Sequence, residues 1–222
     1  MKKYYKAYEE RYKTIHDKGY SWTSDVPTPI VKDVFAKYLK NQGTILEIGC
    51  GEGRDAKLFF EQGNNYLGVD VSLNAIEYCQ QKYPNHASSF KALDILSDDL
   101  NKKFDFIFAV AVLHMLVLDE DRKAFYKFIY NHLNKGGVAL ITSMGNGVTS
   151  MQSDINKAFD ITKREHFSGE VEVATTSCRM VTFCTFKKEA LENGFIITEE
   201  GITSCIPEFD KLMYLLIHKN SI

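Results

Sequence analysis

The sequence of 222 residues lacks the features that mark membrane, secreted and nucleic-acid-binding proteins. No apolar stretch approaches the roughly 20 residues that a membrane helix requires. The charged, aromatic start MKKYYKAYEERYK contains no apolar segment of a secretory signal. The net charge is only −2, whereas a nucleic-acid-binding domain is usually basic. We therefore expect a cytoplasmic protein whose partner is neither a membrane nor a nucleic acid.

Cysteine pairs at metal-binding spacing are also missing. The five cysteines are an odd number and form no CxxC motif, so neither a disulfide framework nor a metal site is expected. Reduced thiols that pack as small hydrophobic side chains are the ordinary state in the cytosol. The composition, with 45% hydrophobic and 25% charged residues, suits one globular domain over residues 1–222.

Short apolar runs alternate with helical patterns along most of the chain. Parallel strands need crossover helices, so this alternation predicts a parallel sheet. The last two strands follow each other without a helix, which indicates an antiparallel C-terminal edge strand. We predict an α/β fold with a Rossmann-like, doubly wound sheet of seven mostly parallel strands. The expected strands lie at 44–49, 65–71, within 87–95, and at 104–113, 136–143, 195–202 and 212–219, with an exposed strand or hairpin at 170–183; the expected helices lie at 2–13, 31–39, 54–63, 72–84, 119–133, 151–164 and 186–195.

A glycine-rich turn follows the first strand, in the stretch TILEIGCGEGRDAKLFF of residues 44–60. Glycines at alternate positions, Gly49, Gly51 and Gly53, let the main chain approach a ligand closely. The next helix offers its N-terminal amides to the same ligand. The spacing GxGxG misses the dinucleotide fingerprint GxGxxG by one residue, and the P-loop pattern is absent.

Three carboxylates stand near the carboxyl ends of three successive strands: Glu47, Asp70 and Asp94. Ligands of such sheets bind beyond these strand ends. Carboxylates only accept hydrogen bonds, so the matching ligand offers donors at three points, such as an ammonium group, a ribose diol and an exocyclic amine. S-adenosylmethionine meets this requirement, whereas a pyrophosphate would be repelled.

With these motifs the sequence resembles the class I S-adenosylmethionine-dependent methyltransferases, strongly over residues 43–143. ILEIGCGEG, LGVDVS, ALDIL, FDFIFAVAVLHML and LNKGGVALIT occur in the order and at the spacing usual in that family. The form GEGRD is similar to that of small-molecule methyltransferases of the tellurite-resistance and thiopurine type. The resemblance implies S-adenosylmethionine as cofactor.

The resemblance also implies a role for each matching residue. Arg54, which opens the following helix, either reaches the carboxylate of the cofactor or is an ordinary exposed arginine at a helix start. The other implied contacts are Glu47 and the backbone of Gly49 and Gly51 with the methionine part, Cys50 and Gly53 within the same turn, Asp70 with the ribose, Val71, Asp94 and Ile95 around the adenine, and Ala109 and Val110 at the methionine end.

The acceptor is expected to bind between two segments outside the cofactor core: residues 1–28, interpreted as a lid, and residues 144–184. His114 is the candidate proton acceptor, although a hydrogen-bonded histidine at a helix start is the alternative. No [DNS]PP[YFW] motif follows the fourth strand, so methylation of nucleobase or glutamine amino groups is not favoured. The candidate substrate contacts are Tyr8, Tyr12, Trp22, His114 and Arg179.

Two functions fit these features. The first is an enzyme, monomeric or homodimeric, that transfers a methyl group to a small-molecule acceptor. The alternative is a non-catalytic sensor or partner subunit that binds S-adenosylmethionine or S-adenosylhomocysteine. Only a competent acceptor pocket separates the two, because both need the same glycine-rich turn.

Overall fold

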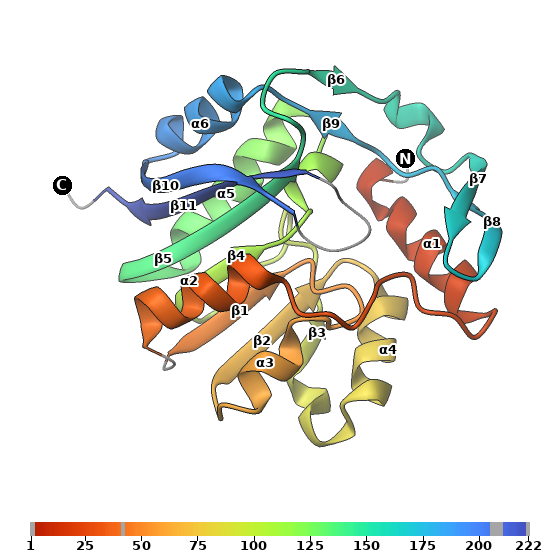
Figure 1. Cartoon of the computed structure of the whole chain (residues 1–222), viewed down its shortest axis with the longest axis horizontal. Coiled ribbons are helices and arrows are strands. Elements are labelled where there is room, and N and C mark those ends of the chain that lie inside the picture. Colours follow the sequence, from red (N-terminus) through yellow and green to blue (C-terminus); the bar gives the residue numbers. More distant parts are fainter. Residues whose placement is uncertain (1–2, 41–42, 205–210, 221–222) are drawn as a thin grey trace.

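A seven-stranded β-sheet forms the centre of the protein (Figure 1). The computed structural model describes residues 3–40, 43–204 and 211–220. The strand order is β10-β11-β5-β4-β1-β2-β3, and every pair from β5 to β3 is parallel. The strands are β1 (Thr44–Ile48), β2 (Asn65–Asp70), β3 (Phe90–Ala92), β4 (Phe104–Ala109), β5 (Leu133–Met144), β10 (Phe195–Thr203) and β11 (Leu212–Lys219).

The expected fold class is confirmed, but the C-terminal strand does not lie at the edge. Strand β11 is antiparallel and sits between β5 and β10, so that β10 is the edge strand. The sequence LMYLLI of β11 is buried along most of its length, as a central strand requires. Strand β10 alternates exposed and half-buried residues, which suits an edge.

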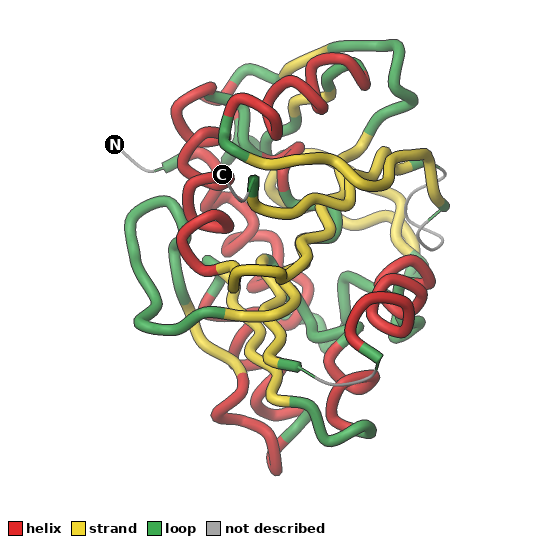
Figure 2. Tube along the Cα trace, turned by 90° about the vertical axis from the view of Figure 1, so that its left-hand side faces the viewer, coloured by secondary structure: helices red, strands yellow, loops and turns green. Residues whose placement is uncertain are grey.

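Helices cover both faces of the sheet (Figures 1 and 2). One core cluster joins α5 and α6 to the sheet, and a second joins α2, α3 and α4 to the opposite face. Ser72 caps α4 as its sequence position predicts, because its Oγ accepts from the amide of Ala75 at 3.1 Å. None of the described helices has the length and apolarity needed to cross a membrane. The α-helices are α1 (Ala7–His16), α2 (Pro29–Leu39), α3 (Ala56–Phe60), α4 (Leu73–Lys82), α5 (Asp119–His132) and α6 (Phe183–Glu192); the 3₁₀ turns are η1 (Tyr4–Lys6), η2 (Pro84–Ser89), η3 (Leu113–Met115) and η4 (Ile155–Lys157).

The helix expected at 151–164 is wrong. The segment forms β6 (Met151–Gln152), the turn η4 and β7 (Ile161–His166) instead. Asp154 caps the short turn by accepting from the amide of Asn156, and the alternating sequence ITKREH pairs with β8 (Gly169–Ala174). The hairpin expected within 170–183 therefore has β7 as its partner strand, while β9 (Arg179–Met180) pairs with β6.

The N-terminal helix packs against this hairpin. The guanidinium of Arg11 donates to the carbonyl oxygens of Ala174 and Thr175 beside the end of β8. Ile15 joins the buried valines of β8 in a small apolar cluster that Trp22 covers. We call residues 3–25 together with the β7–β8 hairpin the cap, because the two segments lie side by side at one end of the sheet (Figure 1).

Candidate active site

The glycine-rich turn folds back onto strand β2. The amides of Gly49 and Cys50 both donate to the carbonyl oxygen of Val69, at 2.7 and 3.0 Å. Gly49 has φ +69° and Gly51 has φ +51°, a region that glycine adopts without strain. A Cβ atom on Gly51 would lie 2.6 Å from the Tyr12 hydroxyl oxygen. With the N-terminal helix in this position, the turn therefore has no room for a side chain at Gly51.

Asp70 connects this turn to the end of β2. Its Oδ2 accepts from the amide of Gly51 at 2.9 Å, and its Oδ1 accepts from the amide of Ser72 at 2.8 Å. Burial raises the pKa of Asp70 to about 6, although the two backbone hydrogen bonds oppose that shift. A buried carboxylate is thus held at the point where a ligand would meet the turn.

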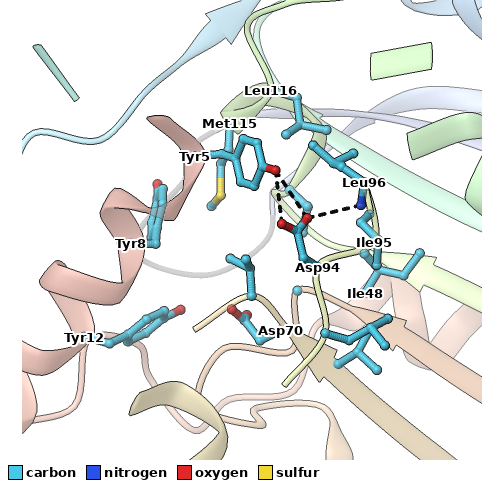
Figure 3. Close-up of a pocket in the computed structure, with 15 residues that line it drawn as sticks. Tyr5, Tyr8, Tyr12, Ile48, Asp70, Asp94, Ile95, Leu96, Met115 and Leu116 are labelled. Carbon is cyan, nitrogen blue, oxygen red and sulfur yellow. Dashed lines mark hydrogen bonds between the residues drawn. The ribbon is translucent and has the colours of Figure 1, made fainter. Parts of the chain in front are cut away.

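A cavity of about 80 Å³ opens beyond the carboxyl ends of β1, β2 and β3 (Figure 3). We call it the strand-end cavity. The tyrosines of the N-terminal segment close it on one side, and Asp70 and Asp94 lie on the other. Its lining residues are Tyr5, Tyr8, Tyr12, Ile48, Gly49, Val69, Asp70, Val71, Leu93, Asp94, Ile95, Leu96, Val112, Met115 and Leu116.

Asp94 already holds polar groups of the N-terminal segment. Its Oδ2 accepts from the Tyr5 hydroxyl at 3.1 Å and pairs with the ammonium groups of Lys3 at 3.1 Å and Lys6 at 3.3 Å. Burial raises the pKa of Asp94, but the hydrogen bonds from Lys3, the Leu96 amide and Lys6 outweigh it, and the net pKa is lowered. The carboxylate therefore stays ionised, and the cap is closed over it.

A second and larger cavity, of about 1130 Å³, lies between the cap and the sheet. We call it the cap cavity. Tyr8 lines both cavities, so they adjoin at this side chain. The lining is more polar than that of the strand-end cavity and comes from segments far apart in the chain. Its residues are Tyr8, Arg11, Ser21, Trp22, Thr23, Ser24, Asp25, Arg54, His114, Met144, Met151, Ser153, Arg164, Glu165, His166, Phe167, Thr175, Thr176, Ser177 and Cys178.

His114 lies in the turn η3 and lines the cap cavity. Arg122 fastens this turn, because its Nη1 donates to the carbonyl oxygens of Leu113 at 2.8 Å and Leu116 at 3.2 Å. Glu189 holds Arg122 in turn through a bidentate ion pair. Burial, with a smaller effect of the Arg122 charge, lowers the pKa of His114 to about 4. The imidazole is therefore neutral near pH 7 and can accept a proton.

Most of the predicted site residues line one of the two cavities. Arg54 is among them and lines the cap cavity. The residues in the strand-end cavity are Tyr8, Tyr12, Gly49, Asp70, Val71, Asp94 and Ile95, and those in the cap cavity are Tyr8, Trp22, Arg54 and His114.

Other predicted residues line neither cavity. Glu47 is buried on the opposite face of β1 from Ile48, because side chains alternate along a strand, and it accepts from the Tyr66 hydroxyl. Burial raises the pKa of Glu47 well above its usual range. Arg179 donates to the Val117 carbonyl at 2.7 Å and pairs with Asp119. The predicted contacts of these residues, and of Cys50, Gly51, Gly53, Ala109 and Val110, stay predictions.

The sequence analysis missed Glu52, the buried carboxylate inside the glycine-rich turn. Its oxygens accept from the amides of Trp22 and Thr23, both at 2.7 Å, and from the Thr23 hydroxyl at 2.9 Å. The Nε2 of His16 lies 2.8 Å from the same carboxylate. Glu52 therefore ties the cap to the cofactor turn. An acid between two glycines was the only available signal, and it did not reveal partners 29 and 30 residues away.

Known proteins are similar to this chain in sequence. Residues 46–139 match the family described as a methyltransferase domain. The chain is 22% identical over 178 residues to a malonyl-acyl-carrier-protein O-methyltransferase of Acetivibrio thermocellus, covering 72% of this chain and 61% of that protein. It is 27% identical over 95 residues to a putative methyltransferase of Invertebrate iridescent virus 6, covering 42% and 34%. The chain thus spans about a third to three fifths of the length of these curated relatives.

Solved structures show the same fold. The 1,6-didemethyltoxoflavin-N1-methyltransferase of Burkholderia thailandensis superposes with a TM-score of 0.68 at 16% identity, covering 94% of this chain and 85% of that one. Residues 46–139 thus match a methyltransferase domain in sequence, and the strand order and the superposition show that the fold is that of a methyltransferase.

S-adenosylmethionine is the cofactor of this class, and the strand-end cavity suits it. The carboxylates of Asp70 and Asp94 can accept from hydroxyl and amino groups of an adenosine. Val71 and Ile95 supply apolar surface between these acids, and Gly49 leaves the backbone accessible. The present volume of about 80 Å³ is well below the roughly 300–1,000 Å³ of small-molecule sites.

Proposed function

We propose that this protein transfers a methyl group from S-adenosylmethionine to a small-molecule acceptor bound in the cap cavity. The observation that carries the proposal is that the two cavities adjoin at Tyr8. A cofactor in the first would have its reacting end beside a molecule in the second. A non-catalytic sensor of the cofactor would have no need of the second cavity, which favours the enzyme.

Within this proposal each part of the strand-end cavity has a role. Asp70 accepts from the ribose hydroxyls, and Asp94 and Ile95 meet the adenine. The backbone of Gly49 and Gly51 approaches the methionine part. The bound cofactor supplies a methyl group that its sulfonium already activates. The protein then has to orient the acceptor and keep water out, which are the main contributions to such a displacement.

The cap acts as a lid in this proposal. Lys3, Tyr5 and Lys6 hold Asp94, and Tyr12 lies over Gly51, so the cofactor enters only after these contacts loosen. The same contacts re-form around a bound ligand or give way to it. Closure of the lid would exclude water from the transfer step. Residues 1–28 and 144–184 thus complete the site that residues 43–143 begin.

His114 is the proposed proton acceptor for an acceptor group that must lose a proton. Its low pKa, about 4, keeps it neutral at pH 7 but makes it a weak base. It suits a group that becomes acidic as the new bond forms. Replacing it by Asn should lower kcat by about 100-fold or more while leaving S-adenosylhomocysteine binding unchanged, since positioned proton transfer contributes about 10²–10⁴-fold.

The relatives guide the choice of acceptor class. The Burkholderia neighbour is a methyltransferase with bound 1,6-didemethyltoxoflavin, which favours a free small molecule as acceptor. The Acetivibrio relative acts on a malonyl group carried by a protein, so acyl carboxylates belong in any search. Assays with acceptors of each class distinguish between these possibilities.

A methyl-transfer assay tests the proposal. Purified protein with S-adenosylmethionine is offered thiols, phenols, amines and carboxylic acids, and S-adenosylhomocysteine is measured as the common product. Turnover of at least one acceptor class, lost in His114→Asn or Asp70→Asn, is the expected result. A protein that S-adenosylhomocysteine stabilises against heating, but that releases none of it with any acceptor, would be a binding protein and not an enzyme.

A further inference from the structure

Arg11 is a buried cation that has no anionic partner. It is 5% exposed, and its Nε and Nη2 donate only to the carbonyl oxygens of Ala174 and Thr175. The rings of Tyr8 and Trp22 flank the guanidinium, with centroids 4.9 and 4.8 Å away. Within the described part of the chain it forms no ion pair, and the carbonyl oxygens and the neighbouring Tyr8 that it contacts carry no full negative charge near pH 7. A buried charge is ordinarily paired, so Arg11 suits an anion that comes from outside the protein.

A second arginine faces the same cavity. Arg164 is exposed on β7, and its guanidinium makes neither a hydrogen bond nor an ion pair with any described residue. Burial lowers the pKa of Arg11, Tyr8 raises it, and the positive charge of Arg164 lowers it again, which is the direction expected for repulsion between two guanidinium groups that line one cavity. An anion bound between them would relieve that repulsion.

The acids in the cavity wall do not neutralise these arginines. Asp25 pairs with Lys82 on α4. Glu165 follows Arg164 on β7, and in the described residues it forms no ion pair with Arg11 or Arg164. The histidines of the wall add no negative charge, since His166 is held by the Ser21 carbonyl and stacks on Trp22.

We infer that Arg11 and Arg164 bind an anionic group of the acceptor, a carboxylate or a phosphate, in the cap cavity. The inference rests on the proposed function only in naming the occupant as the acceptor. Guanidinium groups match both anions through paired hydrogen bonds. Because Tyr8 stands one helical turn from Arg11 and also lines the strand-end cavity, the anion would anchor the acceptor while another of its atoms meets the cofactor.

Trp22 provides a local signal for the experiment, because it is the only tryptophan and lies against Arg11. Full-length protein with S-adenosylhomocysteine is titrated with benzoate, phenyl phosphate and benzamide at constant ionic strength, and Trp22 fluorescence is recorded. Benzoate or phenyl phosphate should give a saturable change in Trp22 fluorescence. The compound that binds more tightly shows whether the site prefers a carboxylate or a phosphate. The neutral benzamide should bind at least about tenfold more weakly.

Variants on one strand provide the matched comparison. Arg164→Gln should weaken binding of the anion by about fivefold or more, and Arg164→Lys should have an intermediate affinity. Lys163→Gln removes the same charge from the neighbouring residue, which pairs with Glu170 and does not line the cavity, and should change the affinity less than about twofold. Arg11→Gln tests the buried partner, with thermal melting as a check that the cap still folds.

Two results would overturn the inference: benzamide binding as tightly as benzoate, or equal losses in Arg164→Gln and Lys163→Gln. The proposed function fails separately. If the anion binds as expected but no acceptor is methylated, the anion site stands and the enzyme does not.

Discussion

The two cavities differ in how the chain builds them. The strand-end cavity is small and mostly apolar, and three neighbouring strand ends supply its floor and both of its carboxylates. The cap cavity is larger and more polar, and its walls come from residues 8–25, from single positions such as Arg54 and His114, and from residues 144–178. The cofactor side therefore follows from a local pattern shared by a whole class. The cap cavity depends on contacts between segments that lie far apart in the chain.

Glu52 and Tyr8 join the two regions. Glu52 is part of the glycine-rich turn, yet its side chain accepts hydrogen bonds from Trp22 and Thr23 of the cap and lies against His16. Tyr8 belongs to the cap, yet it lines the strand-end cavity. A substitution in one region should thus change ligand binding or stability in the other.

Removing residues 1–27 should have the largest effect, because it deletes the wall that both cavities share. The sheet lies wholly downstream of Thr28, so we expect the shortened chain to fold. Turnover should fall by about 100-fold or more, since positioning and exclusion of water are lost. S-adenosylhomocysteine should also bind more weakly. Turnover at the full rate would show that the N-terminal segment is only a docked helix and that residues 144–184 form the pocket alone.

Replacing Asp70 by Asn should affect the cofactor side selectively. Two charge-assisted hydrogen bonds are each worth about 1.5–3 kcal/mol, so calorimetric titration should show S-adenosylhomocysteine binding weakened at least tenfold. Asp105→Asn is the control, because Asp105 also accepts from a backbone amide, that of Thr44 at 2.9 Å, but at the opposite ends of the strands. Equal affinities of the Asp70 and Asp105 variants would refute the ribose assignment.

The affinity for S-adenosylhomocysteine should depend on pH through Asp70. Its pKa of about 6 in the free protein means that the carboxyl group is largely protonated at pH 5. Ribose hydroxyls donate to the ionised form, so binding must release this proton, and the dissociation constant should rise by up to about tenfold per pH unit below 6. Above pH 7 it should level off. The Asp70→Asn variant should lose this dependence; if it keeps the wild-type profile, another group titrates.

Replacing Glu52 by Gln should have the smallest effect and should loosen the cap without harming the sheet. One side of the Gln amide can only donate, and it would face the donors of Thr23 or of Trp22. We expect a loss of about 1–3 kcal/mol in stability and faster hydrogen exchange at Trp22 and Thr23, with β1 unchanged. Glu61→Gln, at the exposed end of α3, is the control. Identical exchange in both variants would mean that Glu52 does not hold the cap.

The sequence predicted the sheet well because the residue pattern that marks a strand or a helix lies within a short stretch of chain. Alternating apolar runs located β1, β2 and β4 to within a few residues, and Ser72 marked the start of α4 correctly. The prediction of a helix at 151–164 was wrong because the residue pattern there was ambiguous. Residues 161–166 form a strand since they pair with β8. The prediction that the C-terminal strand lies at the edge of the sheet was wrong. Strand order depends on which strand is buried on both faces, and that is a property of the whole sheet.

The sequence by itself determined the fold class and the acids at the strand ends, because the pattern of residues near each strand end is set within a single βα unit. Tertiary structure alone decided that Glu47 turns away from the cavity, that Glu52 holds the cap, and that Arg11 and Arg164 line the same cavity. The physical reason is the same in each case: hydrogen bonds and charges act over a few ångströms in space, while the groups concerned stand 19 to 153 residues apart in the chain.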